Sequence, residues 1–233
     1  MTARTDIRDT ATMLSQHWPL ADLRLRTPRL ELFLPSLGQL ADLADLAAEG
    51  IHDPAFMPFL QPWTDESPEQ RARGTIQYHW RQWASWTPQR WSLELVVARD
   101  GVVVGTQSIG GNDFGVLREV GTGSWLGRKY HGEGIGTEMR AAVLHLAFAG
   151  LGAHWANSGA FADNAASLAV SRKLGYVENG YSRHVRRGEP VDEVGFRMSR
   201  ADWESHRRTP VEIDGLEPCL PMFGLGGAEE TAR

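Results

Sequence analysis

A short glycine-rich segment contains the residues whose spacing points most directly to chemistry. Residues 131–136 read His-Gly-Glu-Gly-Ile-Gly, and a helical repeat of apolar residues follows from near Thr137. The first N–H groups of a helix lack internal partners and carry the positive end of its dipole. Glycines leave room for an anion to approach those donors. The segment therefore predicts a phosphate or pyrophosphate site, with an ordinary strand–turn–helix connection as the alternative.

The glycine spacing differs from the two commonest phosphate-binding signatures. A dinucleotide fingerprint begun at Gly132 and Gly134 would need its third glycine at Thr137, and one begun at Gly121 would need it at Leu126. No Gly-Lys-Ser/Thr sequence of a phosphate-binding loop follows a four-residue gap. Local spacing alone leaves both the phosphate site and the plain turn open.

Two elements must hold this turn in place. A strand over Glu119–Leu126 precedes it, and the helix that follows ends at Gly150, which we interpret as a left-handed stop. Its inward face is predicted to carry Met139, Val143, Leu146 and Ala147.

The segment before this unit predicts one strand and two helices. The strand lies within Leu23–Leu34. Ser36 with Gln39, and Ser67 with Gln70, form the capping boxes that begin the two helices. The first helix is predicted to end at Gly50 and to turn inward Leu37, Leu40, Leu43, Ala44 and Ala47. The second presents Ile76, His79, Trp80 and Trp83, followed by Trp86 and Trp91; we favour burial in the core, with a pocket wall as the alternative.

The remaining pattern predicts more strands and one further helix. Asp100-Gly101 is typical of a tight hairpin turn between Leu93–Ala98 and Val102–Ile109. The other expected elements are a strand over Ala153–Phe161, a helix from Asp163 to Gly175, a hairpin from Tyr176 to Met198, and a short helix from Ser199. We predict loose residues at 1–16, a single domain over 17–208, and a tail over 209–233 with an additional strand at 211–213.

Composition limits the class of protein. The formal charge of −5 argues against general nucleic-acid binding, and the single cysteine, Cys219, allows no internal disulfide or cysteine metal cluster. No run approaches the ~18 apolar residues of a membrane span, and the N-terminus lacks a secretory signal. We therefore predict a cytoplasmic protein without a metal. The apolar tail residues Leu220, Met222 and Phe223 are expected to pack on their own domain or on a second copy, and we predict a homodimer.

Several short motifs in the sequence resemble those of one enzyme superfamily. Ser124-Trp-Leu-Gly and Tyr130-His-Gly-Glu-Gly-Ile-Gly-Thr-Glu resemble motif A of the GNAT N-acetyltransferases, with His131 where most members have Arg or Gln. Asn164-x-x-Ser167 followed by Lys173-Leu-Gly-Tyr resembles the Rim-type branch, which includes the acetyltransferases of ribosomal-protein N-termini. His17-Trp18-Pro19 and the tryptophan-rich helix resemble an actinobacterial subgroup, some of whose members are associated with succinyl-coenzyme A.

The resemblance implies a fold and an activity. The fold is of the α/β (α+β) class, a mixed, mostly antiparallel, twisted sheet flanked by helices, with strands four and five splayed. The activity is transfer of an acetyl group from acetyl-coenzyme A to a primary amine of a protein, peptide or small molecule. Succinyl-coenzyme A is the alternative donor. A non-catalytic sensor of acyl-coenzyme A is the alternative function.

The resemblance also assigns roles to residues. Backbone groups at Ser124, Trp125 and Leu126 would hold the pantetheine and thioester, and Asn164 and Ser167 would lie near the far end of the pantetheine. The pyrophosphate would be held by His131, Gly132, Glu133, Gly134, Ile135, Gly136 and Thr137.

The groups that move protons are less clearly marked. Ser167 is the candidate proton donor to the departing thiolate, since the tyrosine common further along this helix is absent; a helix-capping hydroxyl is the alternative. Asp113 and Glu119 flank the start of strand four and are the candidate general bases, with plain surface carboxylates as the alternative. His52 and His79 are further candidates, although a lone histidine near apolar residues is more often structural.

Overall fold

One nine-stranded sheet runs through the protein. The computed structural model describes residues 14–226, so residues 1–13 of the predicted loose N-terminus and residues 227–233 of the predicted tail lie outside the described part. The strand order is β7-β8-β6-β5-β4-β3-β2-β1-β9, and β5 and β6 form its one parallel pair. The predicted mixed, mostly antiparallel sheet is thus confirmed. The strands are β1 (Arg24–Arg26), β2 (Glu31–Phe33), β3 (Arg90–Arg99), β4 (Val102–Asn112), β5 (Glu119–Leu126), β6 (Trp155–Phe161), β7 (Val177–Arg186), β8 (Glu189–Ser199) and β9 (Glu212–Asp214).

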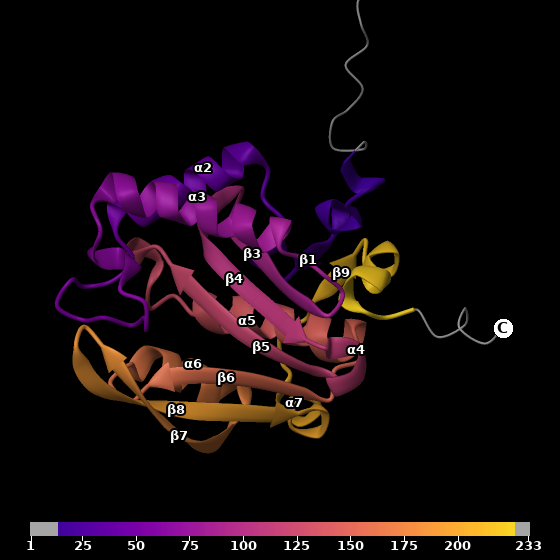
Figure 1. Ribbon diagram of the computed structural model, residues 1–233. Helices are drawn as coiled ribbons and strands as arrows, with labels where there is room; N and C mark the ends of the chain where they lie inside the picture. The colour runs from indigo at the N-terminus through magenta and orange to yellow at the C-terminus, as the bar shows by residue number, and fades with distance from the viewer. Residues whose placement is uncertain (1–13, 227–233) are drawn as a thin grey trace, which may run out of the picture.

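Helices cover both faces of this sheet. Figure 1 shows α2 (Leu37–Glu49) and α3 (Pro68–Ala84) together above the sheet, with α5 (Ile135–His145) behind it. The other helices are α6 (Ala165–Leu174), α7 (Arg200–His206) and the short α4 (Phe114–Leu117). Short 3-10 helices lie at Pro19–Asp22, Trp63–Asp65, Arg128–Tyr130 and Glu217–Phe223.

The central strand β3 explains why both faces need cover. Leu93 and Leu95 belong to the larger buried cluster, with Met139 of α5, whereas Val96 packs with Leu43 of α2 in the smaller one. A strand whose alternate side chains are apolar on both faces is stable only between two layers. The resulting three-layer arrangement positions α5 directly beneath the middle strands.

Local start and stop signals are confirmed at most helices. Ser36 and Ser67 each accept the backbone N–H of the residue three positions on, in complete capping boxes. Gly50 and Gly175 end α2 and α6 with φ of 107° and 92°. The Asp100-Gly101 turn joins β3 to β4 with positive φ at both residues, as the hairpin prediction requires.

Two expectations around the first strand and helix are wrong. Leu23–Leu34 forms two short strands, β1 and β2, because a turn closed by Thr27 N–H to Leu30 O (2.9 Å) folds the chain back on itself. Leu37 is 71% exposed, since it lies in the first turn of α2 beyond the edge of the sheet-facing stripe.

The bounds of α5 also differ from the prediction. The helix begins at Ile135, two residues before Thr137, because Gly134 takes a left-handed conformation (φ 78°) and serves as its N-cap. At the other end, the chain continues through a π-helical turn, Leu146–Gly150, and the positive φ falls on Gly152 (72°), not on Gly150. The predicted stop at Gly150 is therefore wrong.

The tryptophans after α3 and the C-terminal segment pack against each other. Trp86 stacks on Trp91 at 5.7 Å between ring centroids, and both rings contact Phe223, which is fully buried. Burial is thus the confirmed reading for this aromatic group, although Trp80 is 49% exposed. The additional strand is present as β9, paired with β1.

The described part of the tail packs on its own domain, so its apolar residues no longer argue for a second copy. The homodimer and the division at residue 208 stay predictions. Within residues 14–226, no helix has the length and apolar character to cross a membrane.

Candidate active site

The parallel strands β5 and β6 separate after three residue pairs. They are paired at Glu119–Trp155, Val120–Ala156 and Gly121–Asn157, and not beyond. The divergence matches the splay predicted for strands four and five, which are β5 and β6 here because the first predicted strand forms two. It leaves a cavity of about 760 Å³. Its walls come from β5, the glycine turn, α5, the end of β6, the start of α6 and the loop at 51–59. Eleven of the predicted cofactor residues line this one cavity: Ser124, Trp125, Leu126, His131, Gly132, Gly134, Ile135, Gly136, Thr137, Asn164 and Ser167.

The glycine turn points unpaired donors at the cavity. The first α-helical bond of α5 runs from Glu138 N–H to Gly134 O (3.2 Å), so the N–H groups of residues 135–137 precede the hydrogen-bonded part of the helix. A Cβ added at Gly136 would meet only Leu126 Cδ1 and Val170 Cγ2, both at 3.9 Å. Donors, dipole and free space together fit a phosphate.

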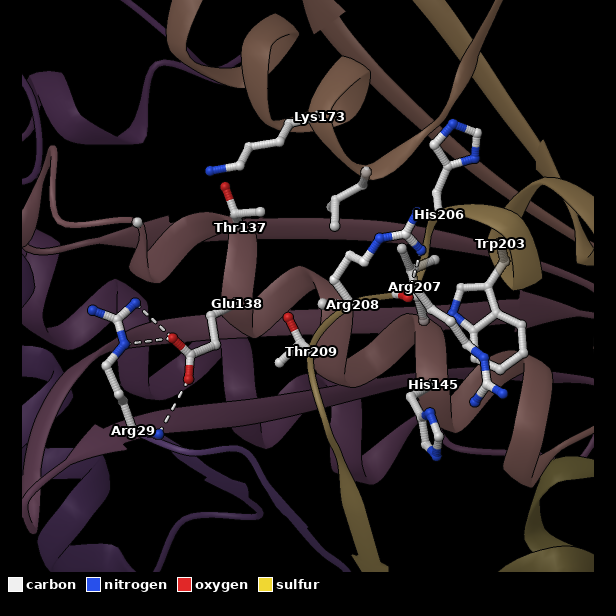
Figure 2. Close-up of a pocket in the computed structure, with 14 residues that line it drawn as sticks. Arg29, Thr137, Glu138, His145, Lys173, Trp203, His206, Arg207, Arg208 and Thr209 are labelled. Carbon is white, nitrogen blue, oxygen red and sulfur yellow. Dashed lines mark hydrogen bonds and ion pairs between the residues drawn. The ribbon is translucent and has the colours of Figure 1, made fainter.

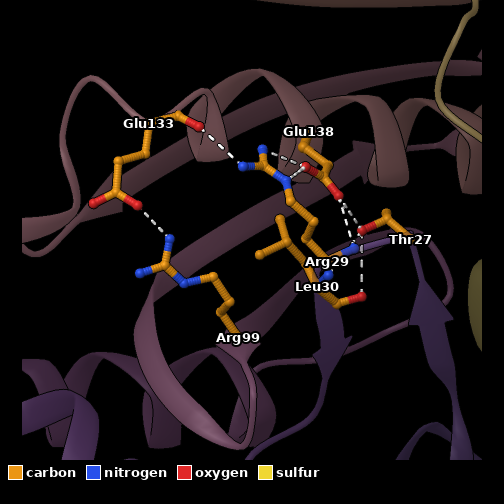
Figure 3. Close-up of polar contacts among 6 residues, drawn as sticks. All are labelled: Thr27, Arg29, Leu30, Arg99, Glu133 and Glu138. Carbon is orange, nitrogen blue, oxygen red and sulfur yellow. Dashed lines mark hydrogen bonds and ion pairs between the residues drawn. The ribbon is translucent and has the colours of Figure 1, made fainter.

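The carboxylates next to these donors are neutralised by arginines (Figure 3). Glu138, in the first turn of α5, accepts bonds from Arg29 Nε (2.7 Å), Arg29 N–H (3.1 Å) and Thr27 Oγ1 (2.6 Å). Glu133 pairs with Arg99, and its backbone oxygen accepts from Arg29 Nη1 (3.1 Å). Of the predicted pyrophosphate residues, Glu133 alone is absent from the cavity wall. Its position instead ties the turn to the β3–β4 hairpin.

A second, smaller cavity of about 270 Å³ adjoins the first (Figure 2). The two share Gly134 and Thr137. Its wall is rich in basic side chains, namely Arg29, His145, Lys173, His206, Arg207 and Arg208, with Glu138 as its one acidic residue. Among the described residues, no carboxylate forms an ion pair with Lys173 or Arg208. The pair of cavities therefore offers anion sites on both sides of the start of α5.

A buried arginine lies beneath the divergence of the strands. Arg140 of α5 is 5% exposed and lines the larger cavity. It donates to Ser124 Oγ on β5 (3.2 Å) and to Ser158 Oγ on β6 (3.0 Å), while its Nε has no partner. Burial lowers the pKa of Arg140, and no carboxylate of the described residues pairs with it. An arginine stays charged at neutral pH, so this is an uncompensated cation on the wall of the cavity.

The start of α6 supplies the two other predicted residues. Asn164 caps the helix by accepting Ser167 N–H at 3.1 Å. Within residues 14–226, no protein atom hydrogen-bonds the Ser167 hydroxyl, and both side chains line the cavity. The capping role thus falls to Asn164, and the Ser167 hydroxyl is left for a ligand.

The two predicted general bases lie outside the cavity wall. Asp113 is exposed at the N-cap of α4, with φ of 47°. Glu119 is already bonded at both oxygens, Oε1 by Asn157 and Oε2 by Arg197 (2.6 Å). Neither has a free oxygen facing the cavity in this arrangement.

The two histidines differ in position. His79 is buried, its Nδ1 lies 3.0 Å from Thr75 O, and burial lowers its pKa. His52 lines the cavity on the 51–59 loop and contacts Thr64 Oγ1 at 2.7 Å. A chain of aromatic rings, Phe59, Trp63 and Trp125, extends this wall, with centroids 5.4 and 6.0 Å apart. No group of three or more His, Cys, Asp or Glu side chains in residues 14–226 could hold a metal ion.

Sequence reasoning missed Arg140 and the 51–59 wall. The signal for Arg140 was its place in α5: it stands four residues after Gly136 and three before Val143, on the face that is otherwise buried. A charged side chain on a buried face needs polar partners, and Arg140 finds them in Ser124 and Ser158 on the two strands that separate. The proline-rich loop carries no periodic signal that could place it.

The fold and this cavity identify the class. The acetyltransferase (GNAT) domain family matches residues 31–177, and the chain belongs to this family of acyl-coenzyme A-dependent N-acetyltransferases. Solved structures with the same fold include Mycobacterium smegmatis RimJ in complex with a coenzyme A disulfide, at 20% identity and TM-score 0.63 over 82% of this chain and 97% of that one. The ribosomal L7/L12 α-N-protein acetyltransferase RimL in complex with coenzyme A is similar at 17% identity and TM-score 0.60, over 74% and 95%. The microcin C7 self-immunity acetyltransferase MccE, in complex with acetyl-coenzyme A and AMP, is similar at 17% identity and TM-score 0.58, over 74% and 93%. These neighbours share the fold of this chain.

Proposed function

We propose that the protein transfers an acetyl group from acetyl-coenzyme A to a primary amine, with the cofactor in the larger cavity. The observation that carries this is the course of the cavity, which leads from the free N–H groups at 135–137, through the gap between β5 and β6, to the Ser167 hydroxyl. The pyrophosphate binds at the helix start. The pantetheine runs along Ser124–Leu126, whose outer edge has no strand partner.

The remaining phosphate of coenzyme A has its own place in this arrangement. The adenosine carries a 3′-phosphate, and the smaller cavity adjoins the pyrophosphate site through Gly134 and Thr137. Lys173 and Arg208 bring charge that no described carboxylate neutralises. We assign the 3′-phosphate to this cavity.

The thiolate takes its proton from Ser167 in this proposal. The Ser167 hydroxyl is free for a ligand, while its backbone is fixed by Asn164. Attack of the amine breaks the C–S bond, and a hydroxyl near the sulfur would protonate the leaving thiolate as it forms.

The test of the proposed function separates binding from turnover. Calorimetry with acetyl-coenzyme A measures binding, and release of free thiol in a panel of amines and peptides measures turnover. The panel includes peptides with free N-termini, because the similar RimL acts on a ribosomal protein N-terminus. Tight binding with thiol release supports the transferase. Tight binding without thiol release from any acceptor would favour a sensor of acyl-coenzyme A.

Arg140 favours a second candidate donor, an acyl-coenzyme A whose acyl group ends in a carboxylate, such as succinyl-coenzyme A. A buried cation without a counter-ion is costly, and a carboxylate entering the cavity would pair with it. The hydroxyls of Ser124 and Ser158 are already held beside that position.

Competition decides between the donors. Acetyl-, succinyl- and free coenzyme A are offered together, and mass spectrometry identifies what remains bound. Preference for succinyl-coenzyme A by at least ~10-fold, about 1.4 kcal/mol, which Arg140→Met abolishes, would support the second candidate. Retention of acetyl-coenzyme A alone would contradict it and leave the acetyl transferase in place.

A further inference from the structure

Three polar side chains meet on the outer strands, at a place that no sequence motif marked. Glu193 of β8 lies 2.7 Å from His184 Nε2 of β7, through its Oε2 atom. Ser182 Oγ is 2.9 Å from the same ring nitrogen and donates to Glu193 Oε2 at 3.3 Å. One oxygen of the carboxylate is therefore held by two donors.

The other oxygen of Glu193 lies against Gly159 of β6, although Glu193 itself is not among the residues that line the larger cavity. Glu193 Oε1 would be 2.1 Å from a Cβ built on Gly159, so the carboxylate occupies the space that a side chain at Gly159 would fill. Gly159 itself lines the larger cavity, beyond the point where β5 and β6 separate. Among the described residues, no donor reaches Oε1.

The surroundings keep this carboxylate in place. Phe161 contacts the His184 ring edge to face, with ring centroids 6.2 Å apart, and Arg186 lies over the Phe161 ring and pairs with Asp163. Arg186 also donates to Met57 O at 2.7 Å, which fastens the hairpin to the 51–66 loop. The Glu193 carboxylate thus lies between the fixed β7–β8 hairpin and Gly159 of β6.

We propose that Glu193 is the general base of the transfer reaction, with His184 and Ser182 as positioning residues. This inference rests on the proposed function, because it assigns the proton acceptor for that same reaction. Glu193 differs from Glu119, whose two oxygens are both engaged by Asn157 and Arg197. A base needs one free oxygen, and among the described residues no donor engages Oε1 of Glu193, which lies against the cavity-lining Gly159.

The step balances without a further reactant. The amine nitrogen forms a bond to the thioester carbon, and its proton passes to Glu193 Oε1. The C–S bond breaks, the thiolate leaves with the electron pair and takes one proton from the Ser167 hydroxyl, which solvent reprotonates, and an amide and a free thiol result. Glu193 then returns its proton to solvent.

The first test replaces the carboxylate by an amide of the same shape. Glu193→Gln should lower kcat by about 10²–10⁴-fold, the usual contribution of a general base, while the affinity for coenzyme A stays unchanged. Glu178→Gln is the matched control: Glu178 lies on β7, is paired with Arg172 on the surface and is not among the atoms nearest to Gly159. It should leave kcat unchanged.

The second test moves the carboxylate without removing it. Gly159→Ala places a methyl group where Glu193 Oε1 now lies, and the three atoms nearest to the new Cβ all belong to that flexible side chain. We expect kcat to fall by at least ~10-fold with wild-type Glu193. In the Glu193→Gln background the same change should add nothing, because the two substitutions act through one group.

The third test concerns the donors behind the carboxylate. His184→Phe removes the N–H that holds Oε2, and kcat should fall with the KM for acyl-coenzyme A unchanged. His184→Gln restores an N–H donor and should recover most of kcat, which a purely structural role would not require.

The outcomes separate this inference from the proposed function. Full activity of folded Glu193→Gln, in an enzyme that does acylate amines, would overturn Glu193 as the base and leave the transferase in place. Absence of thiol release by the wild-type protein would overturn the proposed function itself. Additive effects of Gly159→Ala and Glu193→Gln would show that Gly159 acts through something other than this carboxylate.

Discussion

The two sides of the cavity are built in different ways. The side that we assign to the cofactor consists of two continuous segments, residues 122–140 and 164–170, and it offers mainly backbone N–H groups. The side that we assign to the acceptor is assembled from the 51–66 loop, the end of β6 and the β7–β8 hairpin. Hydrogen bonds hold these parts together, from Arg186 to Met57, 129 positions apart, and from Arg187 to Asp65, 122 positions apart. A local backbone site is visible in the sequence, whereas a site made of distant side chains is not.

The chemistry differs as well as the construction. On the cofactor side the carboxylates Glu133 and Glu138 are neutralised by arginines, so the positive end of α5 remains available to a phosphate. On the other face of the sheet, Glu94 and Glu193 are held by hydroxyl and imidazole groups. The cofactor side is thus suited to holding negative charge, and the acceptor side to exchanging protons.

The largest effect expected on the cofactor side concerns Ser167. If its hydroxyl protonates the thiolate, Ser167→Ala should lower kcat by about 10²–10⁴-fold, with little change in coenzyme A affinity, because the backbone N–H that Asn164 caps remains. Single-turnover kinetics and calorimetry check the two quantities. A loss confined to binding would make Ser167 a pantetheine contact.

The next effect concerns the glycine turn. Gly134 has φ of 78°, so Gly134→Val both strains the turn and narrows the approach to the N–H donors. Coenzyme A affinity should fall at least ~10-fold, about 1.4 kcal/mol, as measured by calorimetry on the folded variant. Gly180→Val is the matched control, since Gly180 also has a positive φ (97°), has nothing within 4 Å of a new Cβ and lines neither cavity. Equal affinity of the valine variant and the wild type would place the pyrophosphate elsewhere.

This contrast explains what the sequence could predict. The sequence predicts the roles of Gly134, Asn164 and Gly175, because backbone conformation and helix capping depend on the few residues nearby. Capping boxes likewise located α2 and α3. The same local reasoning read Leu23–Leu34 as one strand, because the turn at Thr27–Leu30 is closed by contacts that a periodic pattern does not contain.

The acceptor side could not be predicted because its partners are distant. Nothing near Glu193 in sequence distinguishes it from Asp192, which pairs with Arg183 on the surface. Only the register of β7 on β8 places Ser182 opposite Glu193, and only the pairing of β8 with β6 brings Gly159 within reach. Asp113 and Glu119 looked equally suitable on sequence alone, since the bonds that occupy Glu119 come from β6 and β8.

A smaller effect tests whether the cofactor side extends into the second cavity. Lys173→Gln and Arg208→Gln should each weaken coenzyme A binding about 3- to 10-fold, at most ~1.4 kcal/mol, because each removes one exposed cation facing the 3′-phosphate. Dephospho-coenzyme A, which lacks that phosphate, should bind wild type and variants alike. Lys129→Gln is the control, as Lys129 pairs with Glu49 away from this cavity. Equal losses for both ligands would remove the 3′-phosphate from this cavity.

The smallest expected effect is a pH dependence of stability that arises from the buried carboxyl of Glu94. Glu94 is 2% exposed and accepts bonds from Ser92 Oγ (2.7 Å) and Tyr78 OH (3.1 Å), and burial raises the pKa of its carboxyl. The folded state therefore holds the Glu94 proton more tightly than the unfolded state, so the stability contributed by this group is fully present below about pH 4 and is lost as the pH rises through the folded pKa. Glu94→Gln keeps a neutral acceptor in place of the carboxylate. Its melting temperature relative to wild type should rise between pH 4 and pH 8.

Glu178 provides the control of opposite sign, because Arg172 lowers the pKa of its carboxyl. Glu178→Gln should lose stability relative to wild type over the same rise in pH, and the loss should be the smaller of the two since this carboxylate is exposed and screened by solvent. Calorimetric melting curves of both variants and the wild type at pH 4, 6 and 8 measure the two trends. If the melting temperature of Glu94→Gln relative to wild type were the same at every pH, the Glu94 carboxyl would titrate alike in the folded and unfolded states, and burial would not raise its pKa. The groups that exchange protons on the acceptor side would then be Glu193 and its two neighbours alone. The chemical difference between the two sides of the cavity would rest on the Glu193 carboxylate.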